Sequence, residues 1–382
     1  MRKQTAIGAL VLVGIMGISL RAEVIRARSP IHLPDILGYQ TLKCDFHIHT
    51  VFSDGGVWPT IRAEEAWREG LDAIAITDHI EYQPHKDDIP TNHSRSFEIA
   101  KGTGDTLALT VIRGSEVTRK MPPGHINAIF LKTNPPLDTP EWRDALRIAA
   151  EQGAFIFWNH PGWTGQQADG LARWYPEHTE LLEKGLIHGI EVVNDRDYYP
   201  EVHRWALEKN LTMMGNSDVH DPVSMGFDTD HGERRAITLV FATANTPEAI
   251  KEALVAHRTA VLHKDLLIGR QEYLEPIFKA SVKIMNPLVT VKGKGSAYVQ
   301  IANTSDVDFQ LVGTNRLDEV IVSARPILRG GKTVLLMIQG RSPETTGKKS
   351  FDLKYTVTNL KVTPEDGLQV TIPVEVTFVP TK

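Results

Sequence analysis

Hydrophobic and polar positions follow two patterns along this chain, and the change between them divides it into two regions. Between about residues 41 and 268, helix-like stretches alternate with short, continuously apolar runs. Proline often opens a helix-like stretch and glycine often follows it, as expected at helix ends. The expected helices are 61–69, 140–152, 177–184, 200–209 and 247–257, and the apolar runs are 71–77, 154–158, 187–193 and 211–214. Such units predict a parallel sheet buried on both faces, and more than four of them favour a closed α/β barrel.

Beyond about residue 270 the helical pattern disappears and apolar residues alternate with polar ones. The clearest alternating sets are Phe351, Leu353, Tyr355 and Val357, then Val370, Ile372, Val374, Val376 and Phe378. This period of two indicates strands with one buried face. Roughly 110 residues of such strands, separated by turn-forming residues, predict an all-β, immunoglobulin-like sandwich.

The N-terminus carries the pattern of a secretory signal peptide. Arg2 and Lys3 precede an uncharged run that ends before Arg21-Ala22-Glu23, and a small residue at position 22 suits cleavage. The predicted organisation is a signal peptide (1–22), an N-terminal extension (23–40), a barrel (41–270) and an accessory sandwich (275–382). We therefore expect an exported protein, periplasmic or extracellular, with no membrane span after cleavage. The alternative is that the uncharged run is kept as a membrane anchor.

Composition narrows the possible chemistry. Of 382 residues, 41% are hydrophobic and 23% are charged, which is ordinary for a globular protein. A net charge of −5 argues against a nucleic-acid binder that uses a basic surface. Cys44 is the single cysteine, so a disulfide within the chain and a cysteine-rich zinc site are both excluded. Fifteen histidines are the remaining source of metal ligands.

Metal-ligand residue types stand at the ends of the predicted barrel strands. Because chemistry in β/α barrels gathers at the carboxyl ends of the strands, we expect these side chains to meet at one mouth. Buried imidazoles and carboxylates are costly unless they are paired or bound to metal. Nine such residues exceed what one zinc ion needs, which predicts a multinuclear site. The nine are His47, His49, Asp54, His79, Glu116, His125, His160, Asp218 and His220.

The same segments resemble the ordered motifs of the PHP (polymerase and histidinol phosphatase) superfamily. The matching stretches are 47–55, 77–79, 114–116, 124–125, 159–161 and 217–220, and the resemblance covers about residues 41–265. It implies a distorted (β/α)7 barrel with two or three divalent metal ions, and it does not extend to the sandwich. The metal could be zinc, manganese or iron, since histidine with carboxylate suits all three.

The resemblance also implies how the nine ligands are shared. His47, His49, Glu116 and Asp218 would hold one ion. Glu116, as a bridge, would hold a second ion with His125 and His160. The third ion would be held by Asp54, His79 and His220. No ligand position carries an inert residue, so the resemblance implies an active protein.

The function expected from this site is hydrolysis of a phosphate mono- or diester of a small organic molecule by a metal-bridging hydroxide. Glu116, Asp218 and His220 are the expected catalytic residues. Arg196 and Arg119 are the expected phosphate-binding residues, because guanidinium matches phosphate oxygens in pairs, and Trp163 could stack on the substrate.

Two alternatives remain open at this stage: a metal-dependent hydrolase of a non-phosphate bond, and a glycan- or partner-binding protein that uses the sandwich. No nucleic-acid partner is expected, and the sequence predicts no particular oligomeric state.

Overall fold

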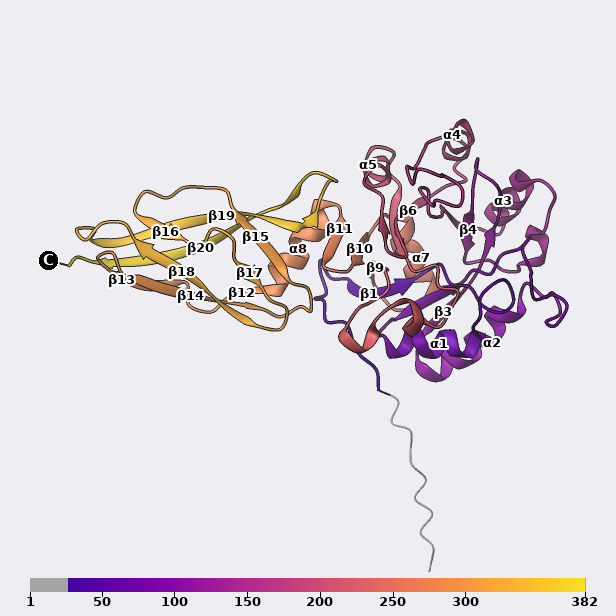
Figure 1. The fold of residues 1–382 in the computed structure, drawn as a ribbon, viewed down its shortest axis with the longest axis horizontal. Coiled ribbons are helices and arrows are strands. Elements are labelled where there is room, and N and C mark those ends of the chain that lie inside the picture. The colour runs from indigo at the N-terminus through magenta and orange to yellow at the C-terminus, as the bar shows by residue number, and fades with distance from the viewer. Residues whose placement is uncertain (1–26, 382) are drawn as a thin grey trace, which may run out of the picture.

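The computed structural model describes residues 27–381 and has two lobes that lie side by side along its long axis (Figure 1). The first lobe is an α/β domain and the second is an all-β sandwich. The predicted fold class, a distorted α/β barrel followed by an immunoglobulin-like sandwich, is confirmed. The predicted signal peptide lies outside the described residues. Within residues 27–381, the helices are all too short or too polar to cross a membrane.

The barrel sheet runs in the order β10, β9, β1, β2, β3, β4, β5, β6, and β8 pairs with the free side of β6. Its strands are β1 (Gln40–Asp45), β2 (Ala73–Ile76), β3 (Thr110–Val117), β4 (Ile126–Ile129), β5 (Phe155–Trp158), β6 (Gly189–Asn194), β8 (Thr212–Asn216), β9 (Ile237–Ala242) and β10 (Thr259–His263). The β1–β2, β2–β3, β5–β6 and β6–β8 pairs are parallel. By contrast, β4 and β9 run antiparallel to their neighbours, which distorts the barrel.

Side chains of β9 and β10, rather than a strand ladder, close the barrel against β8. The Thr238 hydroxyl donates to the Gly215 carbonyl at 2.9 Å and accepts the Gly215 N–H at 3.0 Å. The Thr259 hydroxyl donates to the Met213 carbonyl at 2.9 Å. These bonds bring the end of β8 close to the end of β1, so that Ile48 and Val219 form an isolated bridge. Segments that are about 170 residues apart in sequence therefore meet at one mouth.

Helices cover the outside of this sheet. They are α1 (Pro59–Arg68), α2 (Arg95–Leu107), α3 (Trp142–Glu151), α4 (Pro176–Glu183), α5 (Pro200–Glu208) and α7 (Pro247–Val255), with the short α6 (Val223–Gly226). Proline occupies the first turn of α1, α4, α5 and α7, as the sequence pattern suggested. Helix α2 was not predicted, because its sequence is polar and holds Gly102 and Gly104. It forms because Ala100 and Gly104 pack against the barrel while α1 lies beside it (Figure 1).

The sandwich consists of two facing sheets. One has the order β13, β20, β19, β15, β17, and the other has the order β12, β14, β18, β16. The strands are β12 (Val282–Ile284), β13 (Leu288–Lys292), β14 (Ser296–Asn303), β15 (Phe309–Gly313), β16 (Val320–Val322), β17 (Ile327–Leu328), β18 (Thr333–Gly340), β19 (Gly347–Lys361) and β20 (Gly367–Val379). Along β19, buried residues alternate with polar ones, as the sequence period of two residues predicted. The buried residues are Phe351, Leu353, Tyr355 and Val357.

The junction between the lobes is helical, which corrects the expectation that helices end at about residue 270. Helix α8 (Gln271–Ser281) buries Leu274, Ile277 and Phe278 and carries Pro276 in its interior. Proline weakens a helical sequence pattern, because it removes one backbone bond. Beside α8, strand β11 (Leu266–Gly269) pairs in parallel with β19. The two lobes therefore share one hydrogen-bonded sheet and a continuous apolar core.

Candidate metal centre

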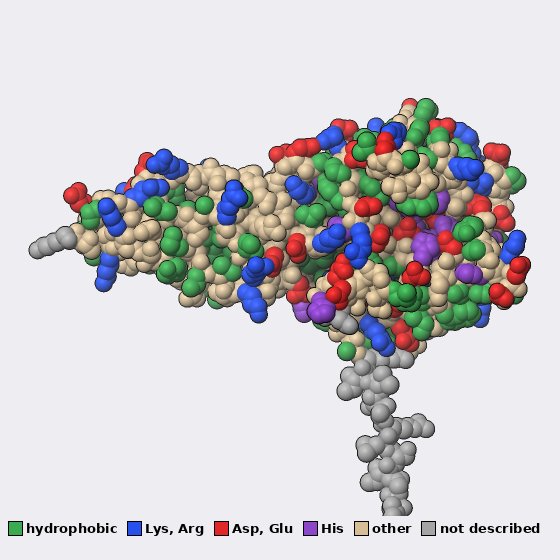
Figure 2. All heavy atoms as spheres, in the orientation of Figure 1, with side chains coloured by type: hydrophobic (Ala, Val, Ile, Leu, Met, Phe, Trp, Pro, Cys, Tyr) green, Lys and Arg blue, Asp and Glu red, His purple; other side chains and the backbone are tan. Residues whose placement is uncertain are grey.

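The structure brings all nine predicted ligands to one mouth of the barrel. Figure 2 shows histidine side chains gathered in a hollow of the barrel lobe, with acidic side chains around them. The segments after β1, β2, β5 and β8 supply His47, His49 and Asp54, then His79, His160, Asp218 and His220. Glu116 lies on β3, and His125 directly precedes the antiparallel strand β4, so it enters from the same side. The ligand atoms form four overlapping groups, within each of which they lie inside 4.8 Å of one another.

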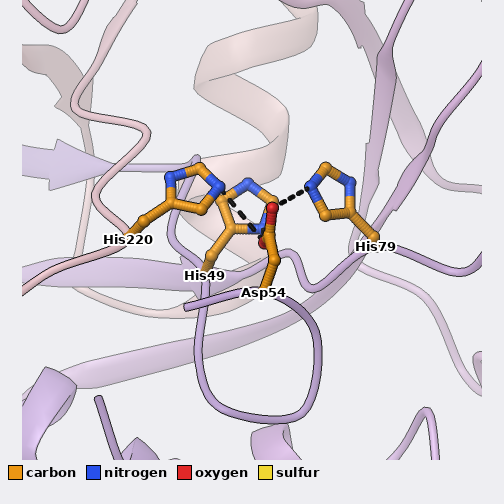
Figure 3. A group of neighbouring side chains, drawn as sticks. All are labelled: His49, Asp54, His79 and His220. Carbon is orange, nitrogen blue, oxygen red and sulfur yellow. Dashed lines mark ion pairs between the residues drawn. The ribbon is translucent and has the colours of Figure 1, made fainter. Parts of the chain in front are cut away.

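The first group surrounds Asp54 (Figure 3). One carboxylate oxygen, Oδ1, lies 3.2 Å from Nε2 of His220 and 3.7 Å from Nδ1 of His49. The other oxygen, Oδ2, lies 3.3 Å from Nε2 of His79. Three imidazoles therefore point at one carboxylate that comes from the loop between β1 and α1.

Two further groups share Glu116, whose side chain is fully buried. Its Oε2 lies 2.6 Å from Nδ1 of His79 and 3.5 Å from Nε2 of His49, and its Oε1 lies 2.9 Å from Nδ1 of His125. Nε2 of His47 lies 3.7 Å from Oε1. Glu116 is thus placed between separate sets of histidines, as a bridging ligand must be.

The fourth group combines His47, His160 and Asp218. Oδ1 of Asp218 lies 3.1 Å from Nε2 of His47 and 3.1 Å from Nε2 of His49. Asp218 and His160 both have positive φ, at 54° and 28°, which is strained for these residues. Their backbone N–H groups are held in place, since Asp218 donates to the His47 carbonyl at 2.9 Å and His160 donates to Glu191 at 2.7 Å.

This grouping differs in detail from the expected sharing of ligands. His160 groups with His47 and Asp218, whereas the expected arrangement placed it with Glu116 and His125. His79 groups with Glu116 and His125 as well as with Asp54. The Nε2 atom of His160 still lies 3.6 Å from Oε1 of Glu116. The assignment of individual ligands to individual ions therefore stays a prediction.

The charges of the site favour bound cations. Burial disfavours the imidazolium form of His79, but Glu116 and Asp54 outweigh it and raise the pKa of His79 to about 10. Burial, together with His79 and His220, lowers the pKa of His49 to about 4. Burial also disfavours the charged form of Glu116, yet His79 and His125 hold its pKa well below the usual value. Ionised carboxylates at the centre thus draw positive charge to this mouth.

Several buried polar atoms of the site make no well-directed hydrogen bond although other ligand atoms lie near them, and this is the observation that fits a metal centre. They include Oδ1 of Asp54, Oε2 of Glu116 and the Nδ1 atoms of His125 and His160. Buried polar atoms in proteins are nearly always satisfied. The atoms of Asp54, Glu116 and His125 belong to the ligand groups described above, where shared cations would satisfy them. Imidazole nitrogens with carboxylate oxygens form a donor set that suits zinc, iron or manganese.

A carboxylate that sequence reasoning missed supports this centre from outside. Glu191 on β6 is fully buried and accepts four hydrogen bonds: from Nδ1 of His47 at 2.9 Å, from the His160 N–H at 2.7 Å, and from the side-chain amides of Asn194 and Asn216 at 2.9 Å each. The bond to Nδ1 directs Nε2 of His47 at the site. A signal existed in the sequence, because Glu191 interrupts an otherwise apolar strand.

Replacing Glu191 with glutamine is expected to weaken metal binding by about 10- to 100-fold, the usual cost of losing such a partner. The glutamine side chain would replace one acceptor oxygen of Glu191 with an NH2 donor. That donor would face other donors, such as Asn194, Asn216 or the His160 N–H. Competition with a chromophoric chelator measures the change. Glu183→Gln, on the exposed surface of α4, is the control and should bind metal as the parent does. Equal affinities for both variants would contradict the role given to Glu191.

Two other carboxylates shape the loops that carry the ligands. Asp78 accepts the Thr50 N–H at 2.7 Å and hydroxyl groups from Thr50 and Ser53 at 2.8 Å each. Asp45 accepts the Ser217 N–H at 3.1 Å and forms a buried ion pair with Arg235 at 3.1 Å. Neither carboxylate contacts a ligand imidazole. They fix the loops after β1 and β8 instead.

A cavity of about 410 Å³ opens above the ligands, and one of the three predicted substrate-binding residues lines it. Trp163 lines it, with its ring 5.2 Å from that of His160. Arg119 and Arg196 do not line it. Arg119 pairs with Glu81 at 2.8 Å and donates to the Thr139 and Pro140 carbonyls. Arg196 pairs with Glu233 at 3.3 Å and donates to the Gly226 carbonyl.

Comparisons with known proteins agree with this geometry. A family model described as an Ig-like domain (DUF5001) matches residues 282–373. The chain is 44% identical to a crystal structure from Bacteroides vulgatus, described as a two-domain protein containing a predicted PHP-like metal-dependent phosphoesterase. That match covers 91% of this chain and 99% of the other, with a TM-score of 0.85. The fold and the site thus define a two-domain protein with a PHP-like barrel and an Ig-like domain. The chain belongs to the PHP superfamily.

Two further matches are more limited. Over 85 residues the chain is 38% identical to an uncharacterised protein of Methanocaldococcus jannaschii. This match covers 22% of this chain and 37% of that protein. An amidohydrolase structure from Chromobacterium violaceum is 16% identical, with a TM-score of 0.36, over 47% of this chain and 88% of its own. Neither match adds to the assignment.

Proposed function

We propose that this protein is a metal-dependent phosphoesterase that hydrolyses a phosphate mono- or diester of a small organic molecule. The observation that carries the proposal is the convergence of nine imidazole and carboxylate ligands in overlapping groups beneath an open cavity. Bound divalent cations supply activation of a water nucleophile and neutralisation of phosphate charge. The description of the Bacteroides vulgatus relative as a predicted phosphoesterase supports the same reaction class.

The chain's own residues divide the remaining work. Glu116 is central and buried, so it holds its neighbouring histidines in one geometry. Asp218 is held by its backbone in a strained conformation that aims its carboxylate at His47 and His49. His220 has the most exposed side chain of the nine, at 36%, and its Nδ1 is held by the Asp218 carbonyl at 2.8 Å. This bond leaves Nε2 of His220 facing Asp54 and the cavity, where it would serve as a metal ligand.

Phosphate release from a panel of monoesters and diesters tests the proposal. The protein is loaded with manganese, zinc or iron, and inorganic phosphate is measured after each reaction. We expect release from at least one ester, loss of release with a chelator, and recovery when the metal is restored. Cleavage of amide or carboxyl ester bonds without any phosphate release would favour the alternative hydrolase instead.

The cavity lining also predicts selectivity against a second phosphate. No lysine or arginine lines this cavity in the described part of the chain, whereas Asp195 and Asp197 stand at its edge. A carboxylate a few ångströms from an added phosphate costs about 1 kcal/mol in water and more where water is excluded. We therefore expect fructose 6-phosphate to have a kcat/KM at least about tenfold higher than that of fructose 1,6-bisphosphate, since 1.4 kcal/mol is a factor of ten.

Neutralising Asp197 tests whether the carboxylates at the cavity cause the expected selectivity against a second phosphate. Asp197→Asn should narrow the difference between the two sugar phosphates, whereas Asp105→Asn, on the exposed face of α2, should leave it unchanged. Steady-state phosphate release gives both values. Equal kcat/KM for the two substrates in the parent protein would contradict this account of the cavity.

We also propose that the protein is exported and acts in the periplasm or outside the cell. The support is the basic, then uncharged, then small-residue pattern that ends at Ala22. N-terminal sequencing of protein from fractionated cells tests this. A chain that starts at Glu23 in a soluble exported fraction is the expected result, and a full-length chain in the membrane fraction would indicate a retained anchor.

A further inference from the structure

A single buried guanidinium joins the two loops that carry most of the candidate ligands. Arg62, in the first turns of α1, has a fully buried side chain. Its Nε donates to the His49 carbonyl at 2.8 Å, and its Nη2 donates to the Val219 and His220 carbonyls. Its Nη1 donates to the Asp221 carbonyl at 2.8 Å and to Glu65 at 3.0 Å. All five N–H donors of the guanidinium are thereby used.

These acceptors belong to two segments that are far apart in sequence. His49 lies on the segment after β1, which also carries His47 and Asp54. The Val219, His220 and Asp221 carbonyls lie on the segment after β8, next to Asp218. The second carboxylate oxygen of Glu65 accepts the Val223 N–H at 3.0 Å, so it extends the same link to the start of α6.

Electrostatics alone would not place an arginine here. A buried cation costs several kcal/mol to desolvate, and burial lowers the pKa of Arg62. One carboxylate, Glu65, and four carbonyl oxygens compensate that cost. A cation behind a metal centre also repels the ions bound there. The rigid fork of donors, which fits five acceptors at once, is the property of Arg62 that this arrangement uses.

We infer that Arg62 is a positioning residue that sets the distance between these two loops and thereby the metal affinity of the group His49, Asp54, His79 and His220. The inference rests on the proposed metal centre. It is specific to this group because two of its members, His49 and His220, present their own carbonyls to the guanidinium. The group formed by His79, Glu116 and His125 has no member whose backbone contacts Arg62.

Arg62→Lys tests the inference, because lysine keeps the charge but cannot reach five acceptors from one nitrogen. The full-length protein is purified without chelator, and metal content, chelator competition and anomalous diffraction are measured. We expect the ion of the His49, Asp54, His79 and His220 group to bind about 10- to 100-fold more weakly, while the ion next to Glu116 and His125 keeps its affinity. Arg68→Lys, at the exposed end of the same helix, is the matched control and should behave as the parent.

Every result separates the inference from a general loss of structure. Equal weakening of all ions, or no weakening, would overturn it. If Arg62→Lys does not fold, Glu65→Gln takes its place, because it loosens the guanidinium without emptying the site. The same selective loss is then expected, and its absence would overturn the inference. A parent protein that binds no manganese, zinc or iron would overturn the proposed centre itself, and the inference with it.

Discussion

Replacing Glu116 with alanine is expected to remove at least one metal ion from the protein and to lower phosphate release by about 1,000-fold or more. Glu116 is the fully buried carboxylate that contacts His47, His49, His79 and His125. Its loss leaves buried imidazoles without their shared anion. Metal-supplied charge stabilisation amounts to several kcal/mol, and each 1.4 kcal/mol is a factor of ten in rate.

Elemental analysis and phosphate release, measured on the same preparation, check this result. Glu151→Ala is the control, because Glu151 is exposed at the end of α3 and pairs with Arg147, away from the ligands. It should retain both metal content and turnover. Full turnover in Glu116→Ala would show that the reaction does not depend on this centre.

Deleting residues 275–382 is expected to unfold the barrel rather than to release an active domain. The cut falls inside α8, which removes Ile277 and Phe278 and exposes Leu274 and Tyr273. It also removes β19, the partner of β11, and so exposes Leu267. Each such side chain contributes about 1.5–3 kcal/mol when buried, or on the order of 10 kcal/mol for all five. That is similar to the whole stability of a typical domain, about 5–15 kcal/mol.

Solubility and a thermal unfolding curve of the truncated chain measure this effect. Leu335→Ser is the control for changes in the sandwich itself, because Leu335 is 57% exposed on β18. Its unfolding temperature should match that of the parent. A soluble truncated barrel with a cooperative transition and a full metal complement would show that the two lobes are independent.

The ligands could be predicted from sequence because their signal is local. Most of them lie at or just after the end of an apolar strand, as His79 follows β2 and His160 follows β5. Burying such groups without a metal or a partner would be costly. Strand order was not needed, since barrel strands expose their ends at one mouth. The alternating strands of the sandwich were equally local, because a period of two appears directly in residues 351–357.

Features that depend on contacts between distant segments could not be predicted in this way. Arg62 is recognised only when the loops after β1 and β8 are seen to meet. Glu191 interrupts an apolar strand in the sequence, but its partners are known only from the fold. Arg119 and Arg196 have the right chemistry for phosphate and follow strands, but nearby carbonyls and carboxylates take up their guanidinium groups. Helix α8 was missed because Pro276 obscures a buried set, Leu274, Ile277 and Phe278, that has helical spacing.

Anomalous diffraction at the manganese, iron and zinc edges, from protein purified without chelator, tests the central claim most directly. We expect two or three peaks, about 3.5–4 Å apart, within reach of His47, Glu116, His160 and Asp218, with Glu116 between two of them. A crystal that shows no peak at this mouth, from protein that still releases phosphate in the presence of chelator, would contradict the account.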